Sequence, residues 1–318
     1  MIFIITRRDD VHADLVIGEL RSLGVPYFRL NTDRAHEYLT SLSPDGFQIL
    51  NPKNGKRTCE ADIRSVWLRR RSFPEIDGLS DTFREFTRSE WLHFYKSIWF
   101  VLRDKFWVNS PDSNDRAAIK WLQLAAAKAS GFNVPASLYT NNPTAVVEAE
   151  FLTDTCIYKA HDVGSLATSS EYAIHTSAFE RQNVVSSSPE CDFTLCPGII
   201  QPLIEKAFEL RVTVVGEHIF ATKIDSQASE ISSIDWRRAD PLTLEHSPFP
   251  LSEADKGRCL HLLKQLNLNF AALDFIVTPS GELIFLELNA NGQWGWIQEL
   301  THQPIAKSLA YLLAKNQL

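Results

Sequence analysis

The sequence predicts a mixed protein of the α/β and α+β classes, with parallel strands near its start and antiparallel hairpins near its end. Two observations carry this prediction. The chain opens with a buried-type strand, a helical pattern and a second strand, which together are typical of a βαβ unit. Its last third contains two pairs of apolar strands, each pair joined by a short turn, and such pairs indicate β-hairpins.

Parallel strands are expected in a first lobe of about 110 residues. Strands at Ile2–Thr6 and Pro26–Leu30 flank a helical pattern at Asp10–Leu23, which Gly24 ends. Turn residues between positions 43 and 55 indicate a hairpin at the edge of this lobe.

The first lobe also contains an aromatic helix from about Asp81 to Lys105, after a strand at Val66–Leu68 that leads into Arg69–Arg71. Its apolar residues recur at helical spacing: Phe83, Phe86, Trp91, Phe94, Ile98, Trp99 and Leu102. Such a stripe is typical of a core or a subunit interface, and we favour that interpretation over a ligand role. A strand at Phe106–Val108 closes the lobe.

Residues 111–204 are expected to form a second lobe. Asn114 or Asp115 can cap an alanine-rich helix that runs to Ala129 and ends at Gly131. A strand-rich region follows. The segment 160–197 is rich in Ser and Thr but has only one glycine, so we interpret it as a mobile gating loop, not as a phosphate cradle.

The third lobe, residues 205–318, begins with a hairpin and ends with a helix that starts near Lys307. Strands at Arg211–Val215 and His218–Ile224 flank Gly216-Glu217, and a leading glycine suits a two-residue type II′ turn.

A second hairpin in this lobe places polar side chains on one face. Pairing across the turn at 278–281 predicts Asp274 opposite Phe285, with Phe285, Glu287 and Asn289 on the face of Asp274. Glu287 is then a diagonal neighbour of Asp274, about 7 Å away. Oxygen ligands of this kind suit Mg²⁺. The alternative is an exposed polar face of an edge hairpin.

The composition argues against several classes of function. With 39 acidic and 32 basic residues the net charge is −7, which is not the basic footprint of a nucleic-acid-binding protein. No apolar run approaches the ~20 residues of a membrane-spanning helix, and no signal peptide opens the chain. The five cysteines match no common zinc pattern. We therefore expect a cytoplasmic protein that binds neither nucleic acid nor membranes.

A known family is recognisable in Ala271-Ala-Leu-Asp274-Phe-Ile-Val and in Phe285-Leu-Glu287-Leu-Asn289-Ala-Asn-Gly-Gln-Trp294, which resemble the metal-binding end of ATP-grasp ligases. Together with Glu209-Leu-Arg-Val-Thr-Val-Val-Gly216 and Ser233-Ile-Asp235-Trp-Arg237, they resemble the microviridin-type graspetide ligases, whose wider relatives are the RimK-like ligases. The resemblance implies an ATP-grasp fold of three lobes: a βαβ pre-ATP-grasp lobe at 1–110 and two nucleotide-clasping lobes at 111–204 and 205–318.

The same resemblance implies an ATP site. Its nucleotide contacts would be Lys120 and Lys159 at the phosphates, Glu209 at the ribose, and the hinge residues Gln201, Leu203 and Ile204 at adenine. Lysine suits phosphate because it is a compact point charge. Pro202 departs from the family pattern and removes one hinge N–H, but it leaves that of Leu203. The alternatives are solvated lysines and a pairing of Glu209 with Lys206.

The resemblance also implies a catalytic set. Its Mg²⁺ ligands would be Asp274, Glu287 and Asn289. Arg211 and Arg237 would stabilise the γ-phosphate, the acyl-phosphate and the acceptor carboxylate. Asp235 would orient Arg237, in preference to acting as a base. The alternative is a surface pair between Asp235 and Arg238.

The implied function is that of an ATP- and Mg²⁺-dependent ligase. A carboxylate attacks the γ-phosphate, and an amine or hydroxyl then displaces phosphate from the acyl-phosphate. We favour macrocyclisation of a ribosomally made precursor peptide, leader plus core, through ω-ester or ω-amide links, by a homodimer. The alternatives are a RimK-like ligase that joins a free amino acid or small amine to a peptide or protein carboxylate, and a non-catalytic nucleotide-binding module that would lack a metal ligand.

Overall fold

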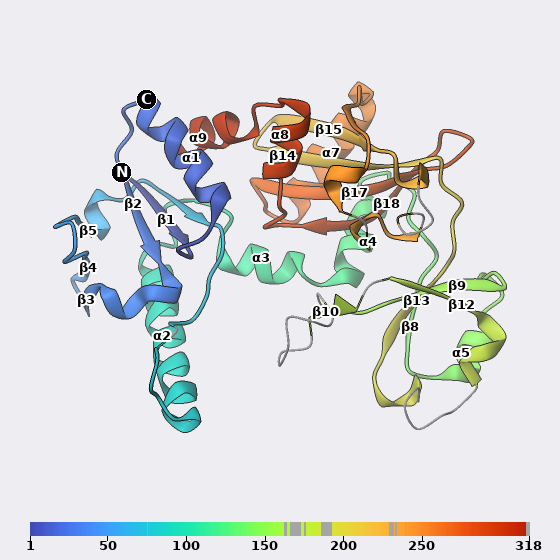
Figure 1. Cartoon of the computed structure of the whole chain (residues 1–318), viewed down its shortest axis with the longest axis horizontal. Helices are drawn as coiled ribbons and strands as arrows, with labels where there is room; N and C mark the ends of the chain where they lie inside the picture. Colours follow the sequence, from blue (N-terminus) through green and yellow to red (C-terminus); the bar gives the residue numbers. More distant parts are fainter. Residues whose placement is uncertain are drawn as a thin grey trace.

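The computed structural model describes residues 1–74, 76–161, 164–165, 173–174, 176–185, 193–228, 232, 234–238 and 240–315. Figure 1 shows the parallel N-terminal sheet at one end of the molecule. The central and C-terminal sheets lie one above the other at the opposite end, and two short helices run between these parts. No helix in the described part is long and apolar enough to cross a membrane.

The N-terminal sheet is parallel, in the order β2-β1-β6-β7. Its strands are β1 (Ile2–Thr6), β2 (Tyr27–Asn31), β6 (Ser65–Leu68) and β7 (Phe106–Val108). Helix α1 (Val11–Ser22) connects the first two strands, so the predicted βαβ unit is confirmed. The Asp10 side chain caps α1 by accepting a hydrogen bond from the His12 N–H, and Gly24 ends the helix region with a φ of 67°.

Two further elements complete the N-terminal part. An antiparallel sheet of β3 (Leu39–Ser43), β4 (Gly46–Leu50) and β5 (Arg57–Cys59) confirms the expected edge hairpin. Helix α2 (Asp81–Val101) is four residues shorter than predicted. Tyr95, Ile98 and Trp99 of its C-terminal half are buried in the core, whereas Phe83 and Phe86 are exposed. The stripe therefore packs in or against the core except at its N-terminal end, where Phe83 and Phe86 are exposed.

The predicted alanine-rich helix is two helices, α3 (Pro111–Ala117) and α4 (Lys120–Ala129). The prediction that Asn114 or Asp115 caps it is wrong, because Ser110 caps α3 by accepting from the Ser113 N–H. Pro111 follows at the first helical position, where its missing N–H costs nothing. Gly131 closes α4 with a φ of 88°, as expected.

The central sheet is antiparallel, in the order β12-β9-β13-β8. Its strands are β8 (Leu138–Thr140), β9 (Thr155–Lys159), β12 (Ser177–Glu180) and β13 (Gly198–Pro202). Helix α5 (Pro143–Glu148) packs Val146 against one face of this sheet. In the segment interpreted as a mobile loop, β10 (Gly164–Ser165) pairs with β11 (Ala173–Ile174). Much of that segment, residues 162–163, 166–172, 175 and 186–192, lies outside the described residues.

The C-terminal sheet is antiparallel, in the order β16-β15-β14-β17-β18. Its strands are β14 (Phe208–Val215), β15 (His218–Ile224), β16 (His246–Pro248), β17 (Phe270–Val277) and β18 (Leu283–Asn289). Helices α4 and α7 (Glu253–Gln265) pack on one face, while α8 (Gly295–Thr301) and α9 (Ile305–Ala314) follow β18. Val215 pairs with His218 and Gly216 has a φ of 58°, so the predicted two-residue turn is confirmed.

The register predicted for β17 and β18 is wrong. Val277 pairs with Leu283, and a β-bulge between Asp274 and Phe275 shifts the remaining pairs by one more residue. Asp274 therefore lies directly opposite Glu287, not diagonal to it. Phe285 pairs with Phe275 in the core and does not share the face of Asp274.

Candidate active site

A cleft between the central and C-terminal sheets collects most of the predicted site residues. Nine of them line it: Lys159, Gln201, Leu203, Ile204, Glu209, Asp235, Arg237, Asp274 and Glu287. Lys120 and Arg211 reach the carboxylates of this cleft through ion pairs. Asn289 lies on the same strand as Glu287 but is exposed, and its side-chain oxygen accepts from the Asn291 N–H.

The central sheet contributes one wall. Lys159 on β9 pairs with Ile199 on β13, and Gln201 follows two residues later on the same face. Burial lowers the pKa of Lys159, although the charge of Glu287 opposes this shift. The Leu203 N–H, expected to be free for the base edge, donates instead to the Thr155 carbonyl at 3.2 Å.

Glu209 is paired inside the cleft. The Lys206 ammonium donates to Glu209 Oε1 at 2.5 Å and to the Ile234 carbonyl at 3.1 Å. Burial raises the pKa of Glu209 despite this partner. The pairing that the sequence left open is therefore present, and it is buried: the side chains are 7% and 6% exposed.

Two carboxylates lie opposite each other on the neighbouring strands β17 and β18. Arg211 on β14 faces Asp274, and its Nη1 donates to both carboxylate oxygens, at 2.8 and 2.6 Å. Burial raises the pKa of Asp274, against the attraction of Arg211. The carboxylates are thus compensated by side chains of the protein itself.

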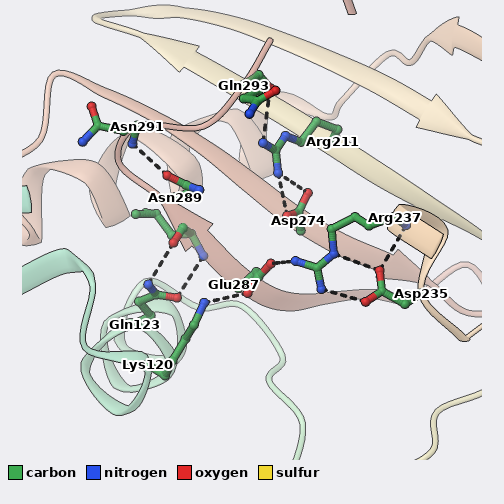
Figure 2. Close-up of polar contacts among 11 residues, drawn as sticks. Lys120, Gln123, Arg211, Asp235, Arg237, Asp274, Glu287, Asn289, Asn291 and Gln293 are labelled. Carbon is green, nitrogen blue, oxygen red and sulfur yellow. Dashed lines mark hydrogen bonds and ion pairs between the residues drawn. The ribbon is translucent and has the colours of Figure 1, made fainter. Parts of the chain in front are cut away.

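Glu287 binds two cations at once (Figure 2). The Lys120 ammonium lies 2.6 Å from Oε2, and Nη1 of Arg237 lies 2.7 Å from Oε1. Burial would raise the pKa of Glu287, but Lys120 and Arg237 outweigh it and the pKa is well below its usual range. Glu287 is therefore ionised at neutral pH.

Arg237 is held from its other side by Asp235. Its Nε and Nη2 donate to the two carboxylate oxygens of Asp235 at 2.8 and 3.0 Å, in a fork geometry. This contact replaces the alternative pair between Asp235 and Arg238. Burial would raise the pKa of Asp235, but Arg237 lowers it overall, so this carboxylate is a poor proton acceptor. The geometry favours orientation of Arg237 over base catalysis.

The loop after β18 passes close to Arg211. The Gln293 carbonyl accepts from Nη2 of Arg211 at 3.3 Å. A Cβ on Gly292 would lie 2.3 Å from the Ala272 Cβ and 2.9 Å from Nη2 of Arg211. Only glycine therefore fits this position of the Asn-Gly-Gln-Trp motif.

Three side chains from the N-terminal part hold this loop, and sequence reasoning missed all three. Nη1 of Arg69 donates to the Asn291 carbonyl at 2.6 Å, and Nδ2 of Asn109 donates to the Ala290 carbonyl at 3.1 Å. Nε2 of His12 accepts from the N–H groups of Trp294 and Gly295, at 3.1 and 3.0 Å. Arg69-Arg-Arg71 after a strand was the only sequence signal for any of them.

His12 must be neutral to accept these two hydrogen bonds. Burial lowers the pKa of His12, and the charges of Arg69 and Arg70 act in the same direction. The carboxylate of Asp10, 3.4 Å from Nδ1, opposes them. The neutral ring with its proton on Nδ1 is the form that fits.

The donor set of the cleft fits a hard cation. Among the described residues no group of three His, Cys, Asp or Glu side chains could hold a metal. The two opposed carboxylates and the side-chain carbonyl of Asn289 on the same strand offer oxygen ligands. Mg²⁺ needs few protein ligands, because it retains water and binds phosphate oxygens.

Comparisons with known proteins identify the fold and the class of protein. Residues 1–115 match the family described as the MvdD pre-ATP grasp domain. The macrocyclase MdnC from Microcystis aeruginosa MRC, crystallised with the precursor peptide MdnA, is 28% identical, with a TM-score of 0.83 over 99% of this chain and 100% of that one. A RiPP-associated ATP-grasp ligase from Chryseobacterium gregarium, in complex with ADP and a leader and core peptide, is 28% identical, with a TM-score of 0.84 over 99% and 96%.

A third structure, the macrocyclase MdnB from the same Microcystis strain, is 26% identical, with a TM-score of 0.78 over 98% of each chain. The comparison with curated protein sequences found no match. The fold is that of the ATP-grasp ligases, so the chain is an enzyme of this class. Within the class it is a graspetide-type ATP-grasp ligase.

Proposed function

We propose that this enzyme uses ATP and Mg²⁺ to macrocyclise a ribosomally made precursor peptide. It would join side-chain carboxylates of Asp or Glu to hydroxyl or amine side chains, as ω-esters or ω-amides. The observation that carries the proposal is the opposed pair of Asp274 and Glu287, bound by Arg211, Arg237 and Lys120. The likeness to a macrocyclase bound with its precursor peptide, over the whole length of both chains, supports the substrate class.

The proposed reaction has two steps. A carboxylate oxygen of the peptide attacks the γ-phosphorus of ATP, the bond to the β-phosphate oxygen breaks, and ADP leaves. A hydroxyl or amine then attacks the acyl carbon, loses its proton, and phosphate leaves with the electron pair of the broken C–O bond. Both steps depend on positioning and charge neutralisation more than on a covalent protein nucleophile.

The cations of the cleft would supply this neutralisation. Lys120 and Lys159 would contact the phosphates, while Arg211 and Arg237 would stabilise the γ-phosphate and the acceptor carboxylate. Mg²⁺, held by Asp274, Glu287 and Asn289, would neutralise charge on the phosphate oxygens. Because Lys120 and Arg237 are bound to Glu287, nucleotide binding would transfer them from this carboxylate to phosphate.

The remaining nucleotide contacts are proposed along the hinge. Gln201, Leu203 and Ile204 would lie along adenine, and Glu209 would accept hydrogen bonds from the ribose hydroxyls. The position of all four in the cleft supports this assignment. Because the Leu203 N–H is already bonded to Thr155, its contribution to the base would come from its carbonyl or its side chain.

We also propose that the enzyme is a cytoplasmic homodimer of the microviridin type, with lobes at 1–110, 111–204 and 205–318. The exposed Phe83 and Phe86 on α2, at 64% and 60%, support a subunit interface on that helix. The cysteines among the described residues are free thiols, which supports a reducing compartment.

The test is incubation of the enzyme with ATP, Mg²⁺ and the peptide encoded beside its gene, followed by mass spectrometry. Each link formed should remove the mass of one water, and an Asp274→Asn variant should form none. Absence of any mass loss with the wild-type enzyme would overturn the proposal. A gain of amino-acid mass would instead indicate the RimK-like ligase.

A further inference from the structure

Strand β18 forms one edge of the C-terminal sheet. In the described part of the chain β18 is the last strand of this sheet, so no further strand follows its outer row of backbone groups, although an isolated bridge lets the Phe285 N–H donate to the Asn133 carbonyl at 2.9 Å. At Leu288 the side chain of Gln123 takes the place of a neighbouring strand. The Leu288 N–H donates to Oε1 of Gln123 at 2.9 Å, and Nε2 of Gln123 donates to the Leu288 carbonyl at 2.8 Å. The primary amide reproduces the donor and acceptor of a peptide group.

Leu288 lies between the two proposed metal ligands of β18. Its N–H belongs to the peptide group shared with Glu287, and its carbonyl to the one shared with Asn289. Fixing both peptide groups fixes the Cα positions of the two ligands. Because a charged site loses function when its ligands shift by a fraction of an ångström, this backbone contact bears directly on metal binding.

Gln123 also fixes the position of Lys120. The two residues lie one helical turn apart on α4, on the same face. From that face Lys120 reaches Glu287 at 2.6 Å, as Figure 2 shows beside the Gln123 amide. Nε2 of Gln123 makes a second hydrogen bond, to the Ala117 carbonyl at the end of α3. One amide, 2% exposed, thus joins α3, α4 and β18.

We infer that Gln123 is a positioning residue that couples Mg²⁺ binding on β18 to phosphate binding by Lys120. The inference rests on the proposed function, since it takes its ligands from there. Gln123 touches neither metal nor phosphate. It sets the distance between the lysine and the carboxylate that must share one nucleotide.

The experiment measures ADP binding by calorimetry over a series of Mg²⁺ concentrations. Gln123→Met keeps the volume and removes all three hydrogen bonds. Gln123→Glu keeps an acceptor for the Leu288 N–H but can no longer donate to the Leu288 and Ala117 carbonyls. It therefore tests the inference if Gln123→Met fails to fold. The matched control is Gln303→Met, because Gln303 binds Ala221 and Thr222 on β15, far from β18 in the same sheet.

Both Gln123 variants should raise the Mg²⁺ concentration at half-maximal enhancement of ADP binding by about 10-fold or more. Affinity for ADP in EDTA should change by less than about twofold, and Gln303→Met should alter neither quantity. A wild-type Mg²⁺ midpoint in the Gln123 variants overturns the inference, as does an equal loss of ADP affinity with and without Mg²⁺. The assay contains no peptide, so failure of the proposed macrocyclisation is detected separately.

Discussion

Replacing Glu287 with glutamine should separate nucleotide binding from magnesium binding. Glu287 holds both Lys120 and Arg237, at 2.6 and 2.7 Å. Phosphate must compete with this carboxylate for the two cations, whereas Mg²⁺ needs the carboxylate itself. Glutamine has the same shape without the charge. The substitution should therefore strengthen binding of metal-free nucleotide while it weakens binding of the metal.

The expected size follows from the exposure of the ion pairs. The side chains of Lys120 and Glu287 are each 23% exposed and that of Arg237 is 45% exposed, so water screens both pairs. Such pairs contribute roughly 0.2–1 kcal/mol each, and releasing two corresponds to at most about 30-fold in affinity. Ligation should instead slow by about 100-fold or more, because a lost metal ligand weakens transition-state stabilisation by several kcal/mol.

The assay is calorimetry of ADP in EDTA and in Mg²⁺, together with ligation rates at limiting Mg²⁺. Glu282→Gln is the matched control, since Glu282 is an exposed carboxylate of the same hairpin and its Oε1 accepts a hydrogen bond from Nδ2 of Asn133. Wild-type ADP affinity in EDTA combined with a wild-type ligation rate for Glu287→Gln would refute the reasoning. Glu287 would then neither restrain the cations nor bind the metal.

Three further substitutions test other parts of the site. Arg237→Lys should reduce ring formation about 100-fold by mass spectrometry, because lysine cannot reproduce the fork on Asp235, while ADP affinity by calorimetry should change little. Lys159→Ala should weaken ATP binding about 10-fold or more by calorimetry, since a charged hydrogen bond to phosphate is lost. His12→Gln should flatten the pH dependence of stability in denaturant titrations between pH 5 and 7.5. The folded state lowers the pKa of His12, so the unfolded state binds more protons, and wild-type stability should fall as the pH drops below about 6.5.

Each of these expectations has a contrary result. Normal ring formation by Arg237→Lys would make Arg237 a structural residue. Wild-type ATP affinity in Lys159→Ala would remove Lys159 from the nucleotide site. An unchanged slope of stability against pH in His12→Gln would mean that His12 does not titrate across the unfolding transition.

Local patterns account for what the sequence predicted correctly. The βαβ unit and the Gly216-Glu217 hairpin depend on periodicity and on a glycine at a fixed turn position, which one chain reveals. The register of β17 and β18 depends on packing instead. Phe275 contacts both Phe132 and Phe285 in the core, with ring centroids 5.0 and 5.6 Å apart, and the β-bulge accommodates this packing. The register was predicted by counting residues on either side of the turn. Such a count cannot include a residue as distant in sequence as Phe132.

In the site, too, local motifs predicted some features and tertiary packing determined the others. Sequence motifs identified nine residues that line one cleft in the structure, although what each of them binds stays a prediction. Two adjacent carboxylates do have cationic partners, as electrostatics requires, but the sequence pattern could not identify these partners as Arg211, Arg237 and Lys120. These partners come from three separate elements, and only the tertiary fold brings them together.

The hydrogen bonds between the N-terminal part and the loop after β18 limit which parts of this enzyme can be exchanged with those of another ligase. Exchange of the N-terminal part for that of another ligase would remove Arg69, Asn109 and His12 together. The carbonyls of Ala290 and Asn291 and two N–H groups at the start of α8 would then lose their hydrogen bonds, next to Arg211. Buried backbone groups left without partners are costly. A working hybrid must therefore retain these three side chains, so the N-terminal part and the loop after β18 have to be exchanged together.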